Sequence, residues 1–304
     1  MLKLFKQREF RLFLMVLPFM VLVFLLSYLP LRGWIYAFYN YKPGLPIGPE
    51  NFVGFDNFRK TVADQYAMAD IVRVLRNTFA MSLIGIATSP LPLIFAVFLS
   101  EVRIMPFRKT VQTLTTIPNF ISWVLVYSVA YAIFSVDDGF VNRLLMQLGL
   151  IDNGIPFLTA SRHVWLTMWS WGTWKGLGWS SIIYIAAITS IDQELYEAAR
   201  VDGAGRFMCM WHITLPGLLP TYFVLLILSI ANFINSGMEQ YYIFQNPMNK
   251  SAIEVLDLYV YNQGIAGINY SYSIAIGMLK SIVSLLLLFI ANRGSKMVRE
   301  ESIF

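Results

Sequence analysis

Long apolar blocks dominate the pattern of hydrophobic and polar positions along this chain, and polar residues gather between them. The blocks are long enough to cross a lipid bilayer as helices, because about 20 apolar residues span its hydrocarbon core. Short amphipathic stripes, which mark the helices of water-soluble proteins, do not set the pattern. We therefore predict an all-α polytopic membrane protein with six transmembrane helices. The predicted spans are 12–38, 77–100, 110–135, 164–189, 217–236 and 272–292.

Composition agrees with this prediction, since 57% of the residues are hydrophobic and only 13% are charged. A water-soluble chain with so little charge could not cover its surface. Prolines inside several blocks favour a packed bundle that encloses a cavity, because neighbouring helices or water must satisfy the carbonyl groups that proline frees. The net charge of +5 does not indicate nucleic acid, since the basic residues flank apolar blocks instead of forming a stripe. A single cysteine, Cys209, and two histidines argue against a disulfide framework and a metal site.

Basic residues near the ends of the spans predict the orientation of the chain. With both termini in the cytoplasm, the inward segments carry a modest excess of lysine and arginine. We therefore expect a cytoplasmic tail over 1–11, a first transmembrane helix and extracytoplasmic loop over 12–76, a core over 77–292 with an inward loop at 190–216, and a cytoplasmic tail over 293–304. The inward basic residues are Lys3, Lys6, Arg8, Arg11, Arg103, Arg108, Lys109, Arg200, Arg206, Arg293, Lys296 and Arg299.

The inward loop 190–216 has the pattern of two helices joined at a glycine. Ser190 and Gln193 have the spacing of a capping box, which predicts that the first helix starts at Ser190. Gly203 stands where a left-handed C-terminal cap is needed. A second helical piece follows, and Pro216 suits the first turn of the next span. Such a rigid wedge outside the membrane predicts a surface on which another protein docks.

Seven positions of this loop fit the signature E-A-A-x3-G-x9-I-x-L-P at the right spacing. They are Glu197, Ala198, Ala199, Gly203, Ile213, Leu215 and Pro216. The loop therefore resembles the ATPase-coupling loop of bacterial ABC-importer permeases. Residues 184–188 and 201–204, which include Asp202, resemble the carbohydrate permeases related to the maltose system. Residues 52–58 and 254–261 resemble the polysaccharide and complex-oligosaccharide branch of that family.

The resemblance implies the type I ABC importer permease fold and an assembly in the bacterial cytoplasmic (inner) membrane. The expected partners are a second homologous permease, two ATP-binding-cassette ATPase subunits, an extracytoplasmic solute-binding protein and membrane lipid. We expect a heterodimer of permeases, although a homodimer stays open. The chain has no phosphate-binding G-x-x-x-x-G-K-[ST] loop. We therefore expect a non-catalytic subunit that binds no cofactor itself, while the partner ATPases use ATP and magnesium.

Charged and aromatic residues inside the predicted spans are the candidates for a substrate pathway. Lys175 falls near mid-membrane in the fourth span, where a lysine costs roughly 2.5–3.5 kcal/mol on insertion scales. Trp171 and Trp174 lie beside it in sequence, and aromatic faces next to a cation suit sugar rings. Lys280 in the sixth span is a second cation, and two cations raise the hypothesis of an acidic oligosaccharide such as a uronate oligomer. In the alternative interpretation, the lysines bond backbone carbonyls and the tryptophans anchor the helices.

Two other functions stay open from the sequence. An ion-coupled secondary transporter would use acidic residues inside the membrane, but the predicted spans contain almost no aspartate or glutamate. A membrane scaffold subunit is the other alternative, and it would not need lysines at mid-membrane. An integral-membrane enzyme would need clustered nucleophiles, bases or metal ligands, and no such residues converge in the sequence.

Overall fold

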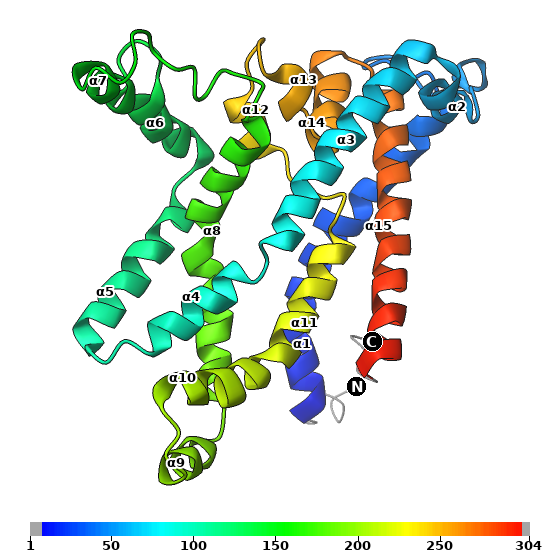
Figure 1. Cartoon of the computed structure of the whole chain (residues 1–304). Helices are drawn as coiled ribbons and strands as arrows, with labels where there is room; N and C mark the ends of the chain where they lie inside the picture. Colours follow the sequence, from blue (N-terminus) through cyan, green and yellow to red (C-terminus); the bar gives the residue numbers. More distant parts are fainter. Residues whose placement is uncertain (1–7, 300–304) are drawn as a thin grey trace. The chain divides into compact units, whose positions relative to one another are not determined.

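The computed structural model describes residues 8–299, and Figure 1 shows that helices make up most of them. Lys3 and Lys6 of the predicted N-terminal tail, and the predicted C-terminal tail from residue 300, lie outside the described residues. The helical elements are α1 (Arg8–Val23), η2 (Phe24–Tyr28), η3 (Leu29–Phe38), η4 (Pro49–Asn51), α2 (Asp56–Ala63), α3 (Gln65–Ala87), α4 (Leu91–Ser100), α5 (Met105–Thr116), η5 (Ile117–Phe120), α6 (Trp123–Phe134), α7 (Phe140–Gln147), α8 (Val164–Thr189), α9 (Gln193–Val201), α10 (Arg206–Cys209), η6 (Met210–Thr214), α11 (Leu215–Ala231), α12 (Glu239–Phe244), α13 (Lys250–Ile253), α14 (Leu256–Tyr261), η7 (Asn262–Ala266) and α15 (Tyr270–Arg299).

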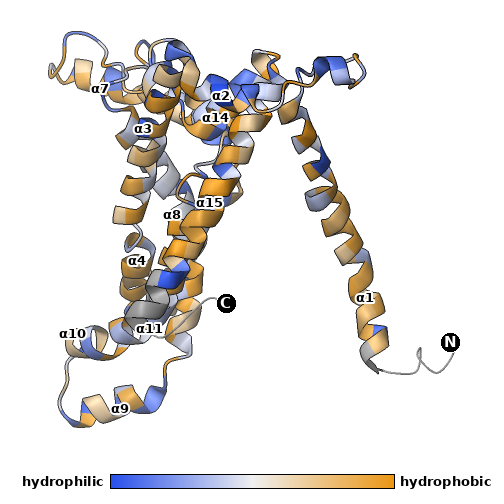
Figure 2. Ribbon diagram, turned by 90° about the vertical axis from the view of Figure 1, so that its right-hand side faces the viewer, coloured by the Kyte–Doolittle hydropathy of each residue, from blue (hydrophilic) through white to orange (hydrophobic). Residues whose placement is uncertain are grey.

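Helices occupy all six predicted spans, but not all of these helices are apolar enough to be identified as membrane spans from their hydropathy alone. Within the described chain, four helices have the length and hydropathy of a membrane span, and a bent pair of helices makes a fifth. The bent pair covers the third predicted span and turns by 108° between its halves. The fourth predicted span is α8, whose 26 residues are long enough to cross a bilayer. Its many tryptophan, glycine and serine residues make α8 less apolar than the others, and Figure 2 shows the mostly hydrophobic residues, in orange, along helices such as α11 and α15.

Two predicted boundaries are wrong. α3 begins at Gln65 instead of residue 77, so the predicted outer loop 39–76 ends earlier than expected. The Asp64 carboxylate explains this start, since its Oδ1 accepts the backbone N–H of Tyr66 at 2.8 Å in the manner of an N-terminal cap. α11 ends at Ala231 instead of residue 236.

The chain folds into two compact units, one formed by the residues up to 68 with 260–280, the other by 69–259 with the residues from 281. In the first unit, aromatic rings order the segment that follows the first span. Phe38 packs edge-on against Phe55 and tilted against Phe58, with ring centroids 5.4 Å apart in both pairs. The buried Asn57 amide donates to the carbonyls of Ala37 at 2.8 Å and Tyr39 at 3.2 Å. This segment is therefore a packed structure and not a flexible linker.

The second unit holds the inward loop and is long, with different elements at its two ends. Figure 1 shows α9 and α10 at one end of this unit and α7, α12 and α13 at the other. Near the α9 end, α4, α8 and α11 share an apolar core. The buried residues of this core are Leu93, Ala96, Val97, Tyr184 and Leu218. A second core at the α7 end includes Val126, Met168, Phe244 and Leu258.

Polar contacts hold α3 to α13 and α14 in this unit. The Arg73 guanidinium pairs with the buried Glu254 carboxylate at 2.9 Å and with Asp70 at 2.9 Å. The buried Asn77 amide donates to the carbonyls of Ser251 and Glu254, both at 3.0 Å. A buried carboxylate needs such partners, because an unpaired charge would cost several kcal/mol. These bonds fix the outer part of α3.

One of the three glycines of α8 lets two backbones touch. At Gly178 a Cβ atom would overlap the carbonyl of Thr115 on α5. At Gly172 it would only reach ordinary contact with Gln240, and at Gly176 it would meet nothing. Close helix packing therefore depends on Gly178 alone among these three, in the way that small residues allow in membrane bundles.

Candidate functional site

The first helix of the inward loop is capped by Asp192. The Asp192 Oδ1 atom accepts the backbone N–H of Glu194 at 3.0 Å, and α9 begins at Gln193. The predicted capping box at Ser190 is wrong, because Ser190 ends α8 and its hydroxyl donates to the carbonyl of Ala187 at 2.8 Å. Aspartate is as good an N-terminal cap as serine, so the sequence alone offered both residues.

The other end of α9 closes as predicted at Gly203. This glycine has a φ of +79°, a left-handed conformation that costs other residues about 1–2 kcal/mol. The N–H of Ala204 donates to the carbonyl of Ala199 at 2.8 Å, and the N–H of Gly203 donates to that of Arg200 at 3.1 Å. These two bonds form the Schellman motif, which satisfies the last carbonyls of the helix. Asp202, which lies between the last helical residue Val201 and Gly203, is the C-terminal cap residue of α9.

We call residues 192–214 the coupling wedge; one contact joins its two helical pieces, and two bonds tie it to the end of α4. The Tyr196 hydroxyl lies 2.9 Å from that of the buried Thr214. Arg206 pairs with the Glu101 carboxylate at 3.3 Å and donates to its carbonyl at 2.7 Å. The second helical piece continues without a break into α11, with Pro216 in the first turn as predicted. The wedge is therefore continuous with α11 and is held against the end of α4.

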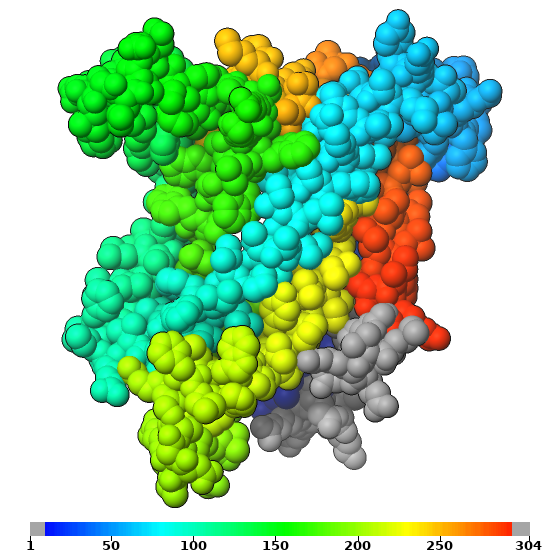
Figure 3. All heavy atoms as spheres, viewed as in Figure 1, coloured from blue at the N-terminus to red at the C-terminus, as the bar shows by residue number. Residues whose placement is uncertain are grey.

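The wedge presents both polar and apolar side chains to its surroundings. Glu197 and Ala198 are exposed, whereas Ala199, Ile213 and Leu215 are half-buried toward the neighbouring helices. Val201 is 88% exposed, and four further apolar side chains stand out beside it. Figure 3 shows the wedge protruding at one end of the second unit. The other exposed apolar residues are Leu195, Phe207, Met208 and Trp211.

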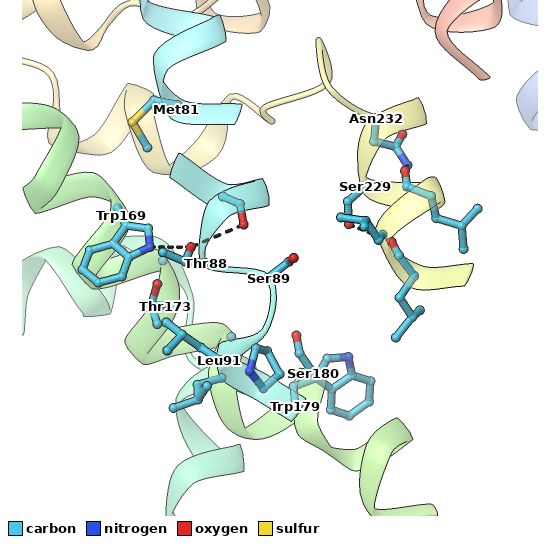
Figure 4. Close-up of a pocket in the computed structure, with 18 of the residues that line it drawn as sticks. Met81, Thr88, Ser89, Leu91, Trp169, Thr173, Trp179, Ser180, Ser229 and Asn232 are labelled. Atoms are coloured by element: carbon cyan, nitrogen blue, oxygen red, sulfur yellow. Dashed lines mark hydrogen bonds between the residues drawn. The ribbon is translucent and has the colours of Figure 1, made fainter. Parts of the chain in front are cut away.

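A cavity of about 720 Å³ lies farther along the same unit, between the α3–α4 turn, α8 and α11. Figure 4 shows that Trp169, Thr173 and Ser180 line it from α8, while Ser229 and Asn232 face them from α11 and its end. Hydroxyl, amide and indole groups provide its polar atoms. None of its lining residues in the described chain carries a charge. Such a lining suits an uncharged polar surface, for example the hydroxyl groups and ring faces of a sugar.

Hydrogen bonds hold several of these side chains in place. The Trp169 indole N–H donates to the Thr88 hydroxyl at 2.9 Å. The hydroxyl of Ser89 lies 3.1 Å from that of Tyr222, and either one can donate. Burial raises the pKa of the Tyr241 phenol, and the Asp257 carboxylate raises it further. This phenol therefore stays protonated and can donate a hydrogen bond. Among the described residues, no group of three or more His, Cys, Asp and Glu side chains could hold a metal ion.

Lys175 lies within α8, the predicted fourth span, and bonds backbone carbonyls. Its Nζ donates to the carbonyls of Pro118 at 3.2 Å and Asn119 at 2.7 Å, and it lies 5.5 Å from the ring of Trp123. It is not among the residues that line the cavity. The alternative interpretation of this lysine, a bond to backbone carbonyls, is therefore the one its geometry fits. The ammonium donates to carbonyls beside the sharp bend between η5 and α6, where the Pro118 carbonyl also accepts the backbone N–H of Ile121 at 3.2 Å.

Trp171 and Trp174 are likewise not among the residues that line the cavity. Trp171 and Trp174 pack edge-on with ring centroids 5.6 Å apart, on a face of α8 that lines a separate crevice. Lys280 lies on α15 in the first unit, so its role on the pathway stays a prediction. The sequence analysis missed Thr88, Ser229 and Asn232, because single polar residues on separate helices form no local pattern.

Comparison with known proteins adds a family and several relatives. Residues 88–299 match the family described as binding-protein-dependent transport system inner membrane component. The chain is similar to Protein LplB of Bacillus subtilis (strain 168), with 40% identity over 98% of this chain and 92% of that protein. It is also similar to the polygalacturonan/rhamnogalacturonan transport system permease protein YteP of the same strain. The identity there is 39%, over 100% of this chain and 92% of the relative.

Two solved structures have the same fold over almost the whole chain. One is a bacterial ABC transporter involved in the import of the acidic polysaccharide alginate, with a TM-score of 0.84 and 31% identity over 96% of this chain and 97% of that chain. The other is a bacterial alginate ABC transporter in complex with an alginate pentasaccharide-bound periplasmic protein. Its TM-score is 0.85 at 30% identity, over 97% of each chain.

Proposed function

This chain belongs to the family of binding-protein-dependent transport system inner membrane components, and from that premise we propose how it couples to its partners and what it carries. It is a carbohydrate ABC-transporter permease with the type I importer fold. The secondary-transporter and scaffold alternatives have no support from its relatives.

We propose that the coupling wedge docks into a groove on an ATP-binding-cassette ATPase. The observation that carries this proposal is its construction: α9 is capped at both ends by its own chain, the Tyr196–Thr214 contact joins the two helical pieces of the wedge, and the second piece runs without a break into α11. A rigid element with exposed apolar side chains can bury them in a partner and transmit that partner's motion to the membrane helices. Glu197 would meet a basic group or backbone donors of the ATPase. Ala198, Val201 and Asp202 would border this contact.

The remaining partners follow from the same assembly. A second homologous permease would complete the transport path, with a heterodimer as the expected arrangement. Two ATPase subunits would bind ATP and magnesium and hydrolyse the ATP, because this chain carries no phosphate-binding loop. A solute-binding protein would deliver the cargo at the α7 end. The wedge and both termini would lie in the cytoplasm, in a bacterial cytoplasmic membrane.

We propose an acidic oligosaccharide, of the uronate type, as the cargo. The relatives support this class, because the name of YteP specifies polygalacturonan and the structural neighbours import alginate, an acidic polysaccharide. The cavity supports a saccharide in general, since hydroxyl, amide and indole groups line it. Lys175 does not support an acidic cargo, because its ammonium group already donates to two backbone carbonyls.

The test is ATPase stimulation in the complete assembly, reconstituted with both permeases, the ATPases and the binding protein. Uronate oligomers loaded on the binding protein should stimulate hydrolysis, and neutral oligosaccharides of equal length should not. Equal stimulation by both would overturn the acidic class. Uptake by this chain without any ATPase would overturn its place in an ATP-driven importer. Glu197→Lys should weaken ATPase binding while the chain still inserts.

A further inference from the structure

A second hollow lies on the opposite side of α8 from the cavity, and we call it the α6–α8 crevice. Its volume is about 930 Å³, and none of its lining residues also lines the cavity. Leu166, Ser170 and Trp174 line it from α8 at helical spacing, and Val129 and Ile133 line it from α6. The α8 helix therefore separates two hollows of different chemistry.

The crevice is apolar and open to its surroundings. Leu166 is 58% exposed, Val129 is 45% exposed and Trp174 is 44% exposed. In water, so much contiguous apolar surface would be costly, and it marks a site of contact with lipid or with a partner. At membrane depth, the material that meets such a surface is the acyl chain of a lipid.

A basic group stands at the mouth of the crevice. Arg162 and His163 belong to its lining and immediately precede Val164, the first residue of α8. Both are exposed, and Arg162 forms no ion pair within the described part of the chain. Arginine at the end of a membrane helix is placed to meet phosphate groups at the bilayer surface. The mouth therefore suits an anionic headgroup.

The length of the crevice matches one leaflet of a bilayer. From His163 to Trp174 the helix rises by about 16 Å at 1.5 Å per residue. Half of the hydrocarbon core measures about 15 Å. An acyl chain whose headgroup lies at Arg162 would therefore reach Trp174.

We propose that the α6–α8 crevice binds one acyl chain of an anionic phospholipid, with its phosphate on Arg162. The site lies in the leaflet at the α7 end, which the proposed orientation makes the outer leaflet. The inference rests on the proposed function only for the membrane location and this orientation. It assigns Trp171 and Trp174 to lipid contact and not to the sugar.

The test uses tryptophan fluorescence of the complete assembly in vesicles whose acyl chains carry bromine, which quenches indoles in contact with them. The vesicles contain either brominated phosphatidylglycerol or brominated phosphatidylcholine in an unbrominated background. The difference between the wild type and Trp174→Phe isolates the signal of Trp174 from that of the other tryptophans. We expect Trp174 to be quenched by brominated phosphatidylglycerol at about fivefold lower mole fraction, the ratio expected for one arginine near an anionic surface.

A matched pair of arginine variants separates the headgroup site from general surface charge. Arg162→Gln should bring the two brominated lipids to equal potency. Arg143→Gln should leave the preference unchanged, because the Arg143 guanidinium already donates to the carbonyl of Asp138 at 2.6 and 2.9 Å.

Three results would overturn the proposal. No quenching of Trp174 in the complete assembly would mean that the second permease covers the crevice or that it is empty. Equal quenching by both lipids in the wild type would show that the crevice has no preference for an anionic headgroup. An unchanged preference in Arg162→Gln would remove that residue as its partner. The measurement needs neither ATP nor sugar, so its failure is distinct from a failure of the proposed transport function.

Discussion

Two bends in the second unit are held in opposite ways. At Gly203 the backbone closes its own turn, with donors and acceptors that all lie between Ala199 and Ala204. Between η5 and α6 the N–H of Ile121 closes one local bond to Pro118, and Lys175, a side chain 56 residues away from Asn119, supplies the other donor. A locally closed turn keeps all its bonds when its surroundings move, whereas the bend at η5 loses the two bonds from Lys175 if α8 withdraws. We therefore expect the wedge to keep its shape during transport, and the bend at η5 to depend on the position of α8.

Replacing the glycine of the wedge should have the largest effect. Gly203→Pro fixes φ near −65° where the chain has +79°, and it removes the N–H that donates to Arg200. We expect a cost of about 3 kcal/mol, which corresponds to roughly a hundredfold loss of the correctly shaped wedge. Sugar uptake per ATP hydrolysed by the reconstituted assembly measures this loss.

A nearby glycine provides the control for this variant. Gly205 has a φ of −72°, and a Cβ there would meet nothing within 4 Å. Gly205→Ala, at the N-terminal cap of α10, should therefore leave the left-handed turn intact and reduce coupling far less than Gly203→Pro. Normal uptake by Gly203→Pro, or an equal loss in both variants, would contradict the role given to the left-handed turn.

The bend at η5 should respond to the loss of its long-range donor. Lys175→Met leaves the carbonyls of Pro118 and Asn119 without this partner, at a cost of about 2 kcal/mol for buried groups. We expect hydrogen exchange at the amides of residues 117–125 to become roughly thirtyfold faster. Lys175→Arg keeps donors in reach and should restore most of the protection. If exchange is unchanged in Lys175→Met, the lysine does not hold the bend.

Replacing the N-terminal cap of α9 should have the smallest effect, and it tests which residue caps this helix. Asp192→Ala removes the acceptor for the N–H of Glu194 and should cost about 1 kcal/mol. Exchange at the first amides of α9 should become about fivefold faster. Ser190→Ala removes only a bond to the carbonyl of Ala187 and should leave these amides protected. The reverse result would restore the capping box at Ser190.

The structure of the wedge was predictable because the residues that determine it are close together in the sequence. The left-handed turn at Gly203 and the position of Pro216 follow from rules that concern a few neighbouring residues. The error at Ser190 has the same origin. Two residues able to cap a helix stand two positions apart, and only the geometry at the end of α8 selects Asp192.

The cavity and the bend at η5 were not predictable because the residues that form them are far apart in the sequence. Thr88 and Trp169 meet only when α3, α4 and α8 are packed, so their sequence neighbourhoods carry no sign of the contact. For Lys175, the sequence indicated a charge that needs a partner at mid-membrane. It could not indicate whether that partner is a sugar or a backbone carbonyl, and the fold supplies two carbonyls.

Gly178 also limits how this permease can be engineered. Because a Cβ at this position would overlap the Thr115 carbonyl, α5 and α8 fit each other as backbones and not through exchangeable side chains. A chimera that takes α8 from a relative with a larger residue there should misassemble unless α5 comes with it. Designs that seek a new cargo should therefore exchange α5 and α8 together, because this close approach depends on both backbones.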